Sequence, residues 1–508
     1  MKLRVPSGAL SRVARQAWLR AMVSGPIRQQ RLVSVYFDTR KFKLRDEGIS
    51  LRVRHAGGRT LQTVKAAGNG SAGTLGRAEW EQEIGGDTPD LAAAADTELG
   101  RLANGKLARQ LRPVFETAVR RTTIPLHVGD SDLELAIDRG QIKVGDDSEP
   151  ISEIEIELKR GDSREVGRIA GRIAGDVPAS YFPLSKPARG YALREGHVAR
   201  AVHAGPIVLD AAMSTGECFR IVAQSCLDQL AANEDAVRAG DGGGIHQMRV
   251  GLRRLRAAMS VFKDVARNSQ LDAVKSELKW LTEQLGPARE LDVFVEEGIV
   301  PLGEEEPGEP GVDELAHELE RRRADAFAQA KVAVDSDRYR RLVLDTTLWL
   351  IDGEWSSDPD RLRAAARHRP VREFATEVLA VRARKVVKKS RKLRELEPRQ
   401  LHKLRIAAKK LRYASEFFDS LYGGAKAKRR KKRVANALKT LQGALGKLND
   451  INVHGRMRAE LISDGEHKPK LAYALGLAAE REHQRVAACL AAAAKAARSL
   501  AEDRPFWR

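Results

Sequence analysis

The chain has 508 residues, enough for two or three domains, and its 89 lysines and arginines against 69 acidic residues give a formal charge of +20. This excess predicts a polyanionic partner: nucleic acid, an anionic membrane surface or an inorganic phosphate polymer. Aromatic residues make up only 5% of the chain, which disfavours single-stranded nucleic acid because base stacking needs aromatic platforms. The three cysteines, Cys218, Cys226 and Cys489, have no CxxC spacing, which argues against a disulfide framework and a zinc site.

The chain also lacks the usual signals for export or membrane insertion. Its first residues have no apolar run of the signal-peptide kind, and no stretch approaches 18 uninterrupted apolar residues. We therefore expect a cytoplasmic protein without a membrane span.

Residues 31 to about 195 are predicted to be rich in β-strands. Period-two alternation marks several segments, and Gly- and Asp-rich turns separate them; examples are 49–54, 77–83 and 151–159. In the last of these, Glu153, Glu155, Glu157 and Lys159 share one face of the strand, and the isoleucines share the other. Helices are expected near residues 7–22 and 163–173.

Charged residues recur on most of these strands. The basic ones are Arg52, Arg54, Lys65, Arg77, Arg121 and Lys159, and the acidic ones are Glu79, Glu81, Glu153, Glu155 and Glu157. A sheet wetted on one side explains any single charged face. If the sheet instead closes with these faces inward, it forms a charged tunnel. Its guanidinium and ammonium groups would bind phosphate oxygens, and its carboxylates would hold Mg²⁺ or Mn²⁺.

Beyond a linker around residues 194–213, the pattern changes to long helices rich in Ala, Leu, Arg and Lys. An acidic, Pro/Gly-rich break at 301–310 divides them into two halves. Residues 278–293 of the first half match 438–453 of the second at a constant offset. Internal duplication of a helical-bundle unit is the economical interpretation.

Each half contains the same array of basic residues. His246, Arg249, Arg253, Arg254 and Arg256 recur as His402, Arg405, Lys409, Lys410 and Arg412. At about 100° per helical residue, positions 0, +3, +7 and +10 from each histidine form one stripe roughly 15 Å long. Like charges on one face repel each other. A lone basic pair usually indicates a solvated helix face, but repetition at matching spacing favours a long, densely charged anion.

Further basic residues lie near these arrays. Lys279 and Lys439 occupy matching places on the following helices, and basic runs cover 382–392 and 426–433. The runs are either solvated surface or an outer fringe that captures the polymer or nucleic acid.

Several motifs of the β-rich region resemble the CYTH domain, the triphosphate tunnel metalloenzymes. They occur in the family's order between about 30 and 195: Tyr36-Phe-Asp38-Thr39, Leu51-Arg52-Val-Arg54, Lys65, Arg77-Ala-Glu79-Trp-Glu81, Asp138-Arg-Gly140, Glu153-Ile-Glu-Ile-Glu-Leu-Lys159 and Ser185-Lys186-Pro-Ala-Arg189-Gly-Tyr191. The resemblance implies an eight-stranded antiparallel tunnel that binds triphosphate and a divalent metal. Members hydrolyse inorganic triphosphate or other triphosphorylated substrates, and some are adenylate cyclases.

With the charge pattern, this resemblance gives the expected site residues. Triphosphate binding is assigned to Arg52, Arg54, Lys65, Arg77, Arg121, Lys159, Lys186 and Arg189, and Mg²⁺ or Mn²⁺ binding to Glu79, Glu81, Glu155 and Glu157.

The start of the chain departs from the family's pattern. The family opens with a Glu-x-Glu-x-Lys strand, whereas this sequence reads Met1-Lys2-Leu3-Arg4, so Lys2 is expected to take the lysine place. The two acidic places then have no counterpart, unless the true start codon lies upstream. Metal-assisted attack on a phosphoanhydride would lose charge neutralisation, although binding by the arginines and lysines would survive.

The two histidine arrays, in turn, resemble the CHAD domain over about 214–500. This family implies two antiparallel four-helix bundles with a basic surface that binds inorganic polyphosphate, here through His246, Arg249, Arg253, Arg254, Arg256, Lys279 and their counterparts His402, Arg405, Lys409, Lys410, Arg412, Lys439. A histidine with an unperturbed pKa near 6.5 would gain charge beside phosphate, so affinity is expected to rise in mild acid.

The sequence therefore predicts an α+β protein with an antiparallel β-tunnel at 1–195, a linker at 196–213 and an all-α domain of two four-helix bundles at 214–508. The leading hypothesis is a polyphosphate-binding protein whose tunnel binds triphosphate, with polyphosphate granules as a cellular location to test. The alternative is a metal-dependent inorganic triphosphatase with the helical domain as its recruiting module. Specific nucleic-acid binding is disfavoured because helix-turn-helix, zinc and RNA-recognition signatures are missing.

Overall fold

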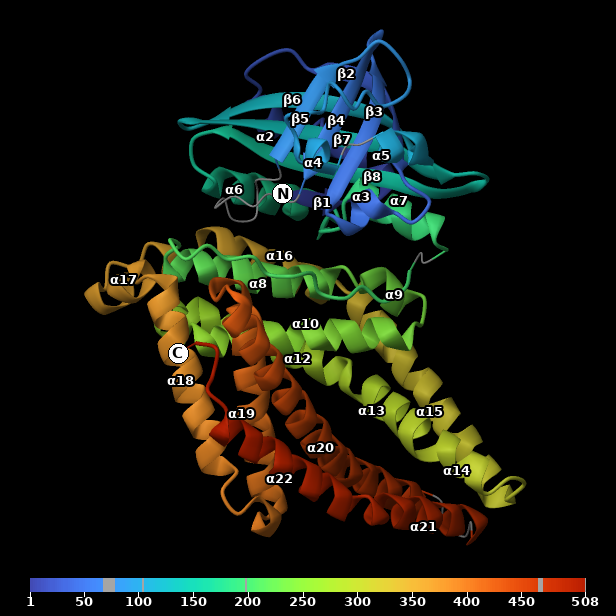
Figure 1. The fold of residues 1–508 in the computed structure, drawn as a ribbon. Coiled ribbons are helices and arrows are strands. Elements are labelled where there is room, and N and C mark those ends of the chain that lie inside the picture. The colour runs from blue at the N-terminus through green and yellow to red at the C-terminus, as the bar shows by residue number, and fades with distance from the viewer. Residues whose placement is uncertain (67–77, 103–104, 197–198, 465–468, 508) are drawn as a thin grey trace. The chain divides into compact units, whose positions relative to one another are not determined.

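The computed structural model describes residues 1–66, 78–102, 105–196, 199–464 and 469–507 (Figure 1). The chain divides into two compact units. The first, here called the sheet unit, comprises Met1–Arg200 together with Asp337–Gly353, and the second, the helical unit, comprises Ala201–Ser336 and Glu354–Arg508. The predicted α+β class with two domains is confirmed.

The sheet unit is built on one antiparallel sheet with strand order β5-β4-β3-β2-β6-β7-β8-β1-β9. Its strands are β1 Lys2–Arg4, β2 Arg28–Asp38, β3 Ile49–Ala56, β4 Arg59–Ala66, β5 Ala78–Glu83, β6 Arg112–Val128, β7 Ser131–Val144, β8 Asp147–Arg160 and β9 Ser180–Tyr181. The family resemblance implies eight strands; the ninth is the two-residue β9, which pairs with β1.

The helices of this unit cover the apolar face of the sheet or connect its strands. They are α1 Ser7–Val13, α2 Ala17–Arg20, α3 Lys43–Asp46, α4 Glu98–Leu102, α5 Gly105–Gln110, α6 Arg164–Asp176, α7 Lys186–Arg194 and α16 Asp337–Asp352. The helix expected at 7–22 is split into α1 and α2, and α6 covers the one expected at 163–173. Ile154 and Ile156 of β8 are buried in one core with Ile169 and Ile173 of α6, which turns the glutamates of β8 to the other face.

Helix α16 belongs to the sheet unit although it comes from the later part of the sequence. Leu344 joins the core formed by α1, α6 and the central strands. Leu348 packs against Gly167 and Gly171 of α6, where an added Cβ would lie 3.3 and 3.2 Å from the leucine methyl groups. Two glycines one helical turn apart thus provide the groove that admits α16.

The helical unit consists of long helices joined by short turns. They are α8 Thr215–Ala231, α9 Glu234–Arg238, α10 Gly242–Val261, α11 Lys263–Ala266, α12 Ser269–Gln284, α13 Gly286–Phe294, the π-helical η1 Val295–Ile299, α14 Val300–Glu305, α15 Pro310–Asp335, η2 Glu354–Ser356, α17 Arg361–His368, α18 Val371–Lys389, η3 Leu393–Glu395, α19 Pro398–Phe417, η4 Asp419–Leu421, α20 Ala425–Asp464, α21 Pro469–Gln484 and α22 Val486–Glu502. The break expected at 301–310 overlaps α14 and ends where α15 begins.

The packing brings the two halves of this unit together along their histidine helices. Helix α10 packs against α8 and α12, and α18, α19, α20 and α22 pack around one another in sequence (Figure 1). Gly251 permits the close approach of α10 to α8, because an added Cβ would lie 2.9 Å from the backbone nitrogen of Leu230. Helix α10 also contacts α19, so the two basic arrays lie on neighbouring helices.

Within the described ranges, the helices are either too short or too polar to cross a membrane.

Candidate functional site

The charged face of the sheet is set by strand register. Arg121 of β6 lies opposite Asp138 of β7, and Asp138 lies opposite Glu153 of β8. Lys2 of β1 lies opposite Glu155, two residues further along β8. Four neighbouring strands therefore place acidic and basic side chains on one face, and α7 adds Lys186 and Arg189 to them.

Asp138, Glu153 and Glu155 form a compact acidic triad. One carboxylate oxygen from each lies within 4.8 Å of the others, and Asp138 and Glu153 are 0% and 1% exposed. Three carboxylates at this separation are the hard oxygen donors that Mg²⁺ and Mn²⁺ prefer, so the residues present fit such an ion.

Basic side chains contact every carboxylate oxygen of the triad. Lys186 Nζ lies 2.7, 2.5 and 2.9 Å from one oxygen each of Asp138, Glu153 and Glu155. Arg121 donates to both oxygens of Asp138 at 2.7 and 2.6 Å and to the second oxygen of Glu155 at 2.7 Å. Arg189 donates to the second oxygen of Glu153 at 3.1 Å. The triad is thus neutralised from within the protein.

These contacts change the pKa values of the groups involved. Burial opposes the charge of Lys186, but the attraction of Glu155, Asp138 and Glu153 outweighs it and raises the lysine pKa above its ordinary value. Burial also opposes the charge of Glu155, and Lys186 and Arg121 outweigh it, so the pKa of this carboxyl falls. Burial lowers the pKa of Lys2 to about 8 despite the nearby Glu153.

The remaining residues predicted for the tunnel lie around a second group on β3, β4 and β5. Lys65 and Arg52 pair with Glu79 at 2.8 and 3.6 Å. Arg54 donates to Ser34 at 3.1 Å, and burial beside Arg52 lowers its pKa to about 10. Glu81 accepts a hydrogen bond from Thr63 at 3.0 Å. Arg77 lies outside the described residues.

The metal ligands expected from sequence are therefore only partly brought together. Glu155 belongs to the triad, but Glu79 and Glu81 pair within the second group. Glu157 is exposed and pairs with Lys159 at 3.1 Å. The expected set lacks Asp138 because the register that places it opposite β8 cannot be read from one strand's alternation. It also lacks Glu153, although alternation puts this residue on the same face of β8 as Glu155.

Asp38, part of one family motif, has a structural role. Its buried carboxylate accepts hydrogen bonds from the backbone nitrogens of Thr39, Leu44 and Arg45, and from the hydroxyl of Tyr191 at 2.8 Å. Burial and the negative Asp38 raise the pKa of Tyr191. This contact fixes α7, and hence Lys186 and Arg189, against the sheet.

The helical unit contains a second concentration of charge, which we call the paired arrays: His246, Arg249, Arg253 and Arg256 of α10 with His402, Arg405, Lys409 and Arg412 of α19. Burial and the positive charges of Arg405, Arg253 and Arg412 lower the pKa of Lys409 to about 7, against the opposing effect of Asp450. Burial and Arg253 likewise lower the pKa of Arg405. The positive charge of Arg253 on α10 therefore lowers the pKa of both Arg405 and Lys409 on α19.

Buried nitrogens without a hydrogen-bond partner concentrate in or beside the paired arrays. They are Nδ1 of His246 and Nε of Arg249, Arg253, Arg254 and Arg405. An unpartnered buried donor costs free energy, about 1–3 kcal/mol in mutational data, so several together mark a site prepared for an acceptor.

His246 differs from the expectation of a histidine with an unperturbed pKa. Burial, with the positive charges of Arg289 and Arg253, lowers the pKa of His246 to about 4. Mild acid therefore does not charge this histidine in the free protein. In the same arrays, the pKa of Lys409 falls to about 7, so this lysine titrates near neutrality.

Sequence reasoning missed two residues that affect the array histidines, one through its charge and one by direct contact. Arg289 of α13 acts on His246, and Asn449 of α20 lies 3.3 Å from Nδ1 of His402 and accepts from Arg405 at 3.2 Å. These two residues occupy equivalent places in the matching segments 278–293 and 438–453. The matching segments pair these two positions, but one residue is an arginine and the other an asparagine. A search for charge repeated in both segments therefore does not find them.

Other residues predicted for the helical site lie at its edge or outside it. Arg254 is buried, donates to Gln229 at 2.7 Å and holds its guanidinium over Phe417, which is a packing role. Burial and the positive charges of Arg382 and Lys385 on α18 lower the pKa of Lys410. Lys279 is exposed and pairs with Glu283 at 3.6 Å, and Arg412 pairs with Glu416 at 3.1 Å. Lys439 is exposed on α20.

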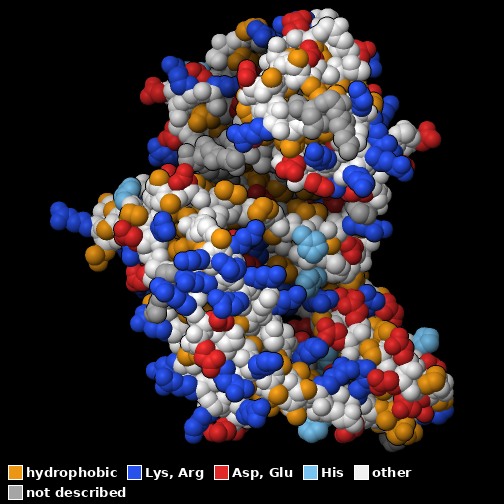
Figure 2. All heavy atoms as spheres, in the orientation of Figure 1, with side chains coloured by type: hydrophobic (Ala, Val, Ile, Leu, Met, Phe, Trp, Pro, Cys, Tyr) orange, Lys and Arg blue, Asp and Glu red, His pale blue; other side chains and the backbone are white. Residues whose placement is uncertain are grey.

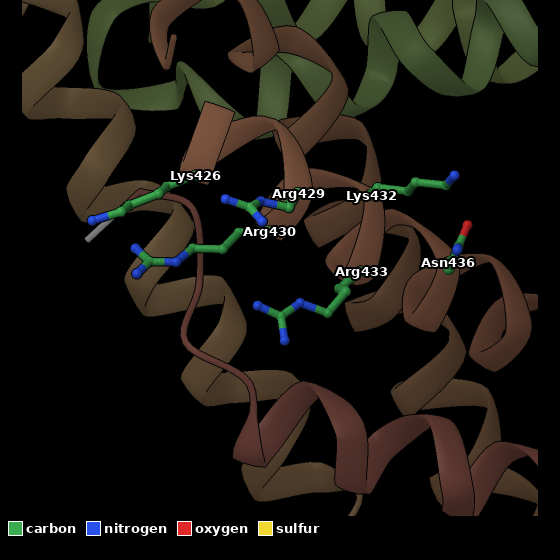
Figure 3. A pocket seen from close by; sticks show the side chains of 6 residues that line it. All are labelled: Lys426, Arg429, Arg430, Lys432, Arg433 and Asn436. Atoms are coloured by element: carbon green, nitrogen blue, oxygen red, sulfur yellow. The ribbon is translucent and has the colours of Figure 1, made fainter. Parts of the chain in front are cut away.

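The basic run at 426–433 forms the first turns of α20. Lys426, Arg429, Arg430, Lys432, Arg433 and Asn436 line a hollow of about 670 Å³ (Figure 3). Arg433 pairs with Asp503 at 3.3 Å. Lysine and arginine side chains also gather densely elsewhere on the surface of the helical unit (Figure 2).

Comparison with protein families gives a match for each unit. The CYTH domain model matches residues 1–181, and the CHAD domain model matches residues 221–459. The inorganic triphosphatase of Haemophilus influenzae is 29% identical over 164 residues, which is 32% of this chain and 46% of that protein. This chain therefore covers less than half the length of that relative.

Two solved structures are similar to this chain. The CHAD domain from the plant Ricinus communis is 29% identical with a TM-score of 0.51, over 60% of this chain and 97% of that chain. PptA from Streptomyces chartreusis is 17% identical with a TM-score of 0.42, over 56% of this chain and 99% of that chain.

Proposed function

The chain is a CYTH domain over residues 1–181 followed by a CHAD domain over residues 221–459, and from this premise we propose that it binds inorganic polyphosphate along the paired arrays. The observation that carries the proposal is the cluster of Arg253 with Arg405 and Lys409, where the positive charge of Arg253 lowers the pKa of the other two and buried nitrogens lack hydrogen-bond partners. A ribbon of phosphates supplies both the negative charge and the acceptor oxygens that these groups lack.

The chemistry of the paired arrays favours polyphosphate over nucleic acid. Polyphosphate carries about one negative charge per phosphate and has no bases to stack. The aromatic rings near the arrays, Phe417 and Tyr413, are buried and so give no platform for a base. Recognition by rows of arginine and lysine alone suits a polymer that consists only of phosphate.

The hollow on α20 extends this binding surface. Contacts of His402 with Asn449 and of Lys431 with Asp419 fix α19 and α20 as antiparallel neighbours. Lys432, Asn436 and Lys439 follow one face of α20, at the helical spacing i, i+4 and i+7. A polyphosphate molecule that extends beyond the paired arrays would therefore reach Lys439 and then the hollow, over a distance of about 20 Å.

Titration of the full-length protein with long-chain polyphosphate tests this function. Binding is expected to be tight and to weaken steeply with salt, since the contacts are ionic. Duplex and single-stranded DNA at equal phosphate concentration and equal salt are the controls. Equal affinity for DNA would make the arrays a generic polyanion surface and would contradict the proposal.

For the sheet unit we propose triphosphate binding on its charged face, with metal-dependent hydrolysis as a second candidate function. The acidic triad and the similarity to a relative named inorganic triphosphatase favour this candidate. Asp138, Glu153 and Glu155 would hold Mg²⁺ or Mn²⁺, which when bound supplies charge neutralisation at the phosphates. Arg52, Arg54 and Arg121 would bind and orient the phosphate oxygens.

Phosphate release from inorganic triphosphate, with Mg²⁺ or Mn²⁺ added, tests the second candidate. An Asp138→Asn variant is the matched control and should abolish any release. A wild-type protein that binds triphosphate but releases no phosphate would restrict the sheet unit to binding and would leave the polyphosphate proposal standing.

A further inference from the structure

Lys186 contacts all three carboxylates of the acidic triad at once. Its ammonium group touches one oxygen of each of the three carboxylates, at 2.5–2.9 Å, and these oxygens come from two strands. Arg121 and Arg189 engage the three remaining oxygens. Arg121 also donates to the Asp138 oxygen that the lysine touches, at 2.6 Å. Removing the lysine alone would therefore free one oxygen each of Glu153 and Glu155 and would leave the Asp138 oxygen with Arg121 as its remaining donor.

The three oxygens that Lys186 covers are the ones a cation would need. A divalent ion bound by one oxygen from each of three carboxylates keeps its other positions for water and phosphate, as Mg²⁺ sites commonly do. The ammonium group and a divalent ion cannot share this position, because both need the same oxygens and their charges repel at contact distance.

We propose that Lys186 is an internal counter-ion that closes the divalent-cation site of the free protein, and that the site opens when an incoming anion takes the ammonium group. The closed state is a balance of charge: Lys186 and Arg121 face three carboxylates, and Arg189 is shared with Glu149 at 2.6 Å. A divalent ion entering this cluster alone, beside the lysine, would add two uncompensated positive charges.

The side chain can leave without disturbing its helix. Lys186 is the first residue of α7, and Ser185 caps that helix by accepting from Ala188 at 3.3 Å. Arg189 ties α7 to Glu149, Glu153 and the carbonyl of Pro150. Gly190 lies so close to Phe115 that an added Cβ would be 2.4 Å from the ring. The flexible four-carbon stem of Lys186 can thus swing toward a phosphate while α7 stays in place.

Two linked equilibria follow. Anion binding and cation binding help each other, because the anion removes the group that blocks the cation, and such coupling is reciprocal. The closing of the cation site does not depend on the proposed function. Only its opening by triphosphate rests on the proposal that the charged face binds this anion.

The test titrates Mn²⁺ alone into the full-length protein, in phosphate-free buffer, by calorimetry and by the electron paramagnetic resonance of free Mn²⁺. Wild type is expected to bind weakly. Lys186→Met, which keeps the stem and removes the charge, should bind roughly 5- to 150-fold more tightly, the usual range for a coupling of this kind. Adding Asp138→Asn to this variant should remove the gain, which would locate the ion at the triad.

Arg160→Met is the matched control, because this arginine also pairs with a carboxylate of the same sheet, that of Asp132, but is exposed. Its Mn²⁺ affinity should equal that of wild type. Equal affinity in wild type and Lys186→Met would overturn the proposal, as would tight binding of Mn²⁺ by wild type, a result that needs no variant to fold. Titration of triphosphate into wild type with a chelator present tests anion binding separately, so its failure would count against the proposed function and not against the counter-ion.

Discussion

The two charged regions of this molecule differ in how their charges are neutralised. On the sheet, each oxygen of the acidic triad has a basic partner, and Lys186 and Arg121 bridge several carboxylates at once. On the paired arrays, the positive charge of Arg253 on α10 lowers the pKa of Arg405 and Lys409 on α19. The negative charge of Asp450 opposes this effect at both residues. The same residue types thus form a closed ionic network on the sheet and a surface prepared for an anion on the paired arrays.

The largest expected effect comes from reversing charge in the paired arrays. Arg253→Glu combined with Lys409→Glu removes two charge-assisted contacts, about 1.5–3 kcal/mol each, and should weaken polyphosphate binding by roughly 10² to 10⁴-fold. Calorimetry at fixed salt measures this loss. An unchanged affinity would mean that the polymer binds elsewhere and that the paired arrays are not a surface prepared for an anion.

The closed network of the sheet unit predicts a large loss of stability instead. Arg121→Leu leaves the fully buried Asp138 without its bidentate partner. Breaking a buried pair in this way costs about 3–5 kcal/mol. Hydrogen exchange of β6 and β7 in the full chain reports the loss. Arg160→Leu, which removes an exposed partner of Asp132, is the control and should cost about 1 kcal/mol or less.

The paired arrays should also bind polyphosphate in a pH-dependent way. The pKa of Lys409 is about 7 in the free protein, and a bound phosphate raises it, so the complex holds more protons than the free protein. Affinity is therefore highest below pH 7 and falls as the pH rises above 7, by up to about tenfold per unit. Lys409→Arg should flatten this profile because arginine stays protonated. A flat wild-type profile between pH 6 and 9 would contradict the assignment.

The smallest effect is expected at the hollow on α20. Changing Lys426, Arg429 and Arg433 to glutamine removes exposed charges, each contributing up to about 1 kcal/mol. Affinity for long polyphosphate should fall roughly three- to tenfold, with little change for chains too short to reach beyond the paired arrays. The control changes three exposed lysines on α15, α21 and α22 to glutamine: Lys331, Lys470 and Lys495. An equal loss in both variants would reduce the hollow to general surface charge.

Much of this architecture could be predicted from sequence, and the limits are physical. Period-two alternation identified the face of β8 that bears Glu153 and Glu155, and the repeated spacing identified the stripes on α10 and α19. Alternation within one strand does not report which neighbour lies opposite, so the contact of Asp138 with Glu153 required the structure. Spacing along a helix likewise does not report burial, and burial lowers the pKa of His246 and of Lys409.

The place of α16 has a consequence for how this protein is made and divided. The chain leaves the sheet unit after Arg200, returns at Asp337 and leaves again after Gly353. During synthesis, the core around α6 waits for more than a hundred further residues before Leu344 and Leu348 arrive. A gene fragment that stops at the apparent end of the first domain would encode a protein with its glycine groove open to solvent. The module that folds is thus defined by packing and not by a cut in the linear sequence.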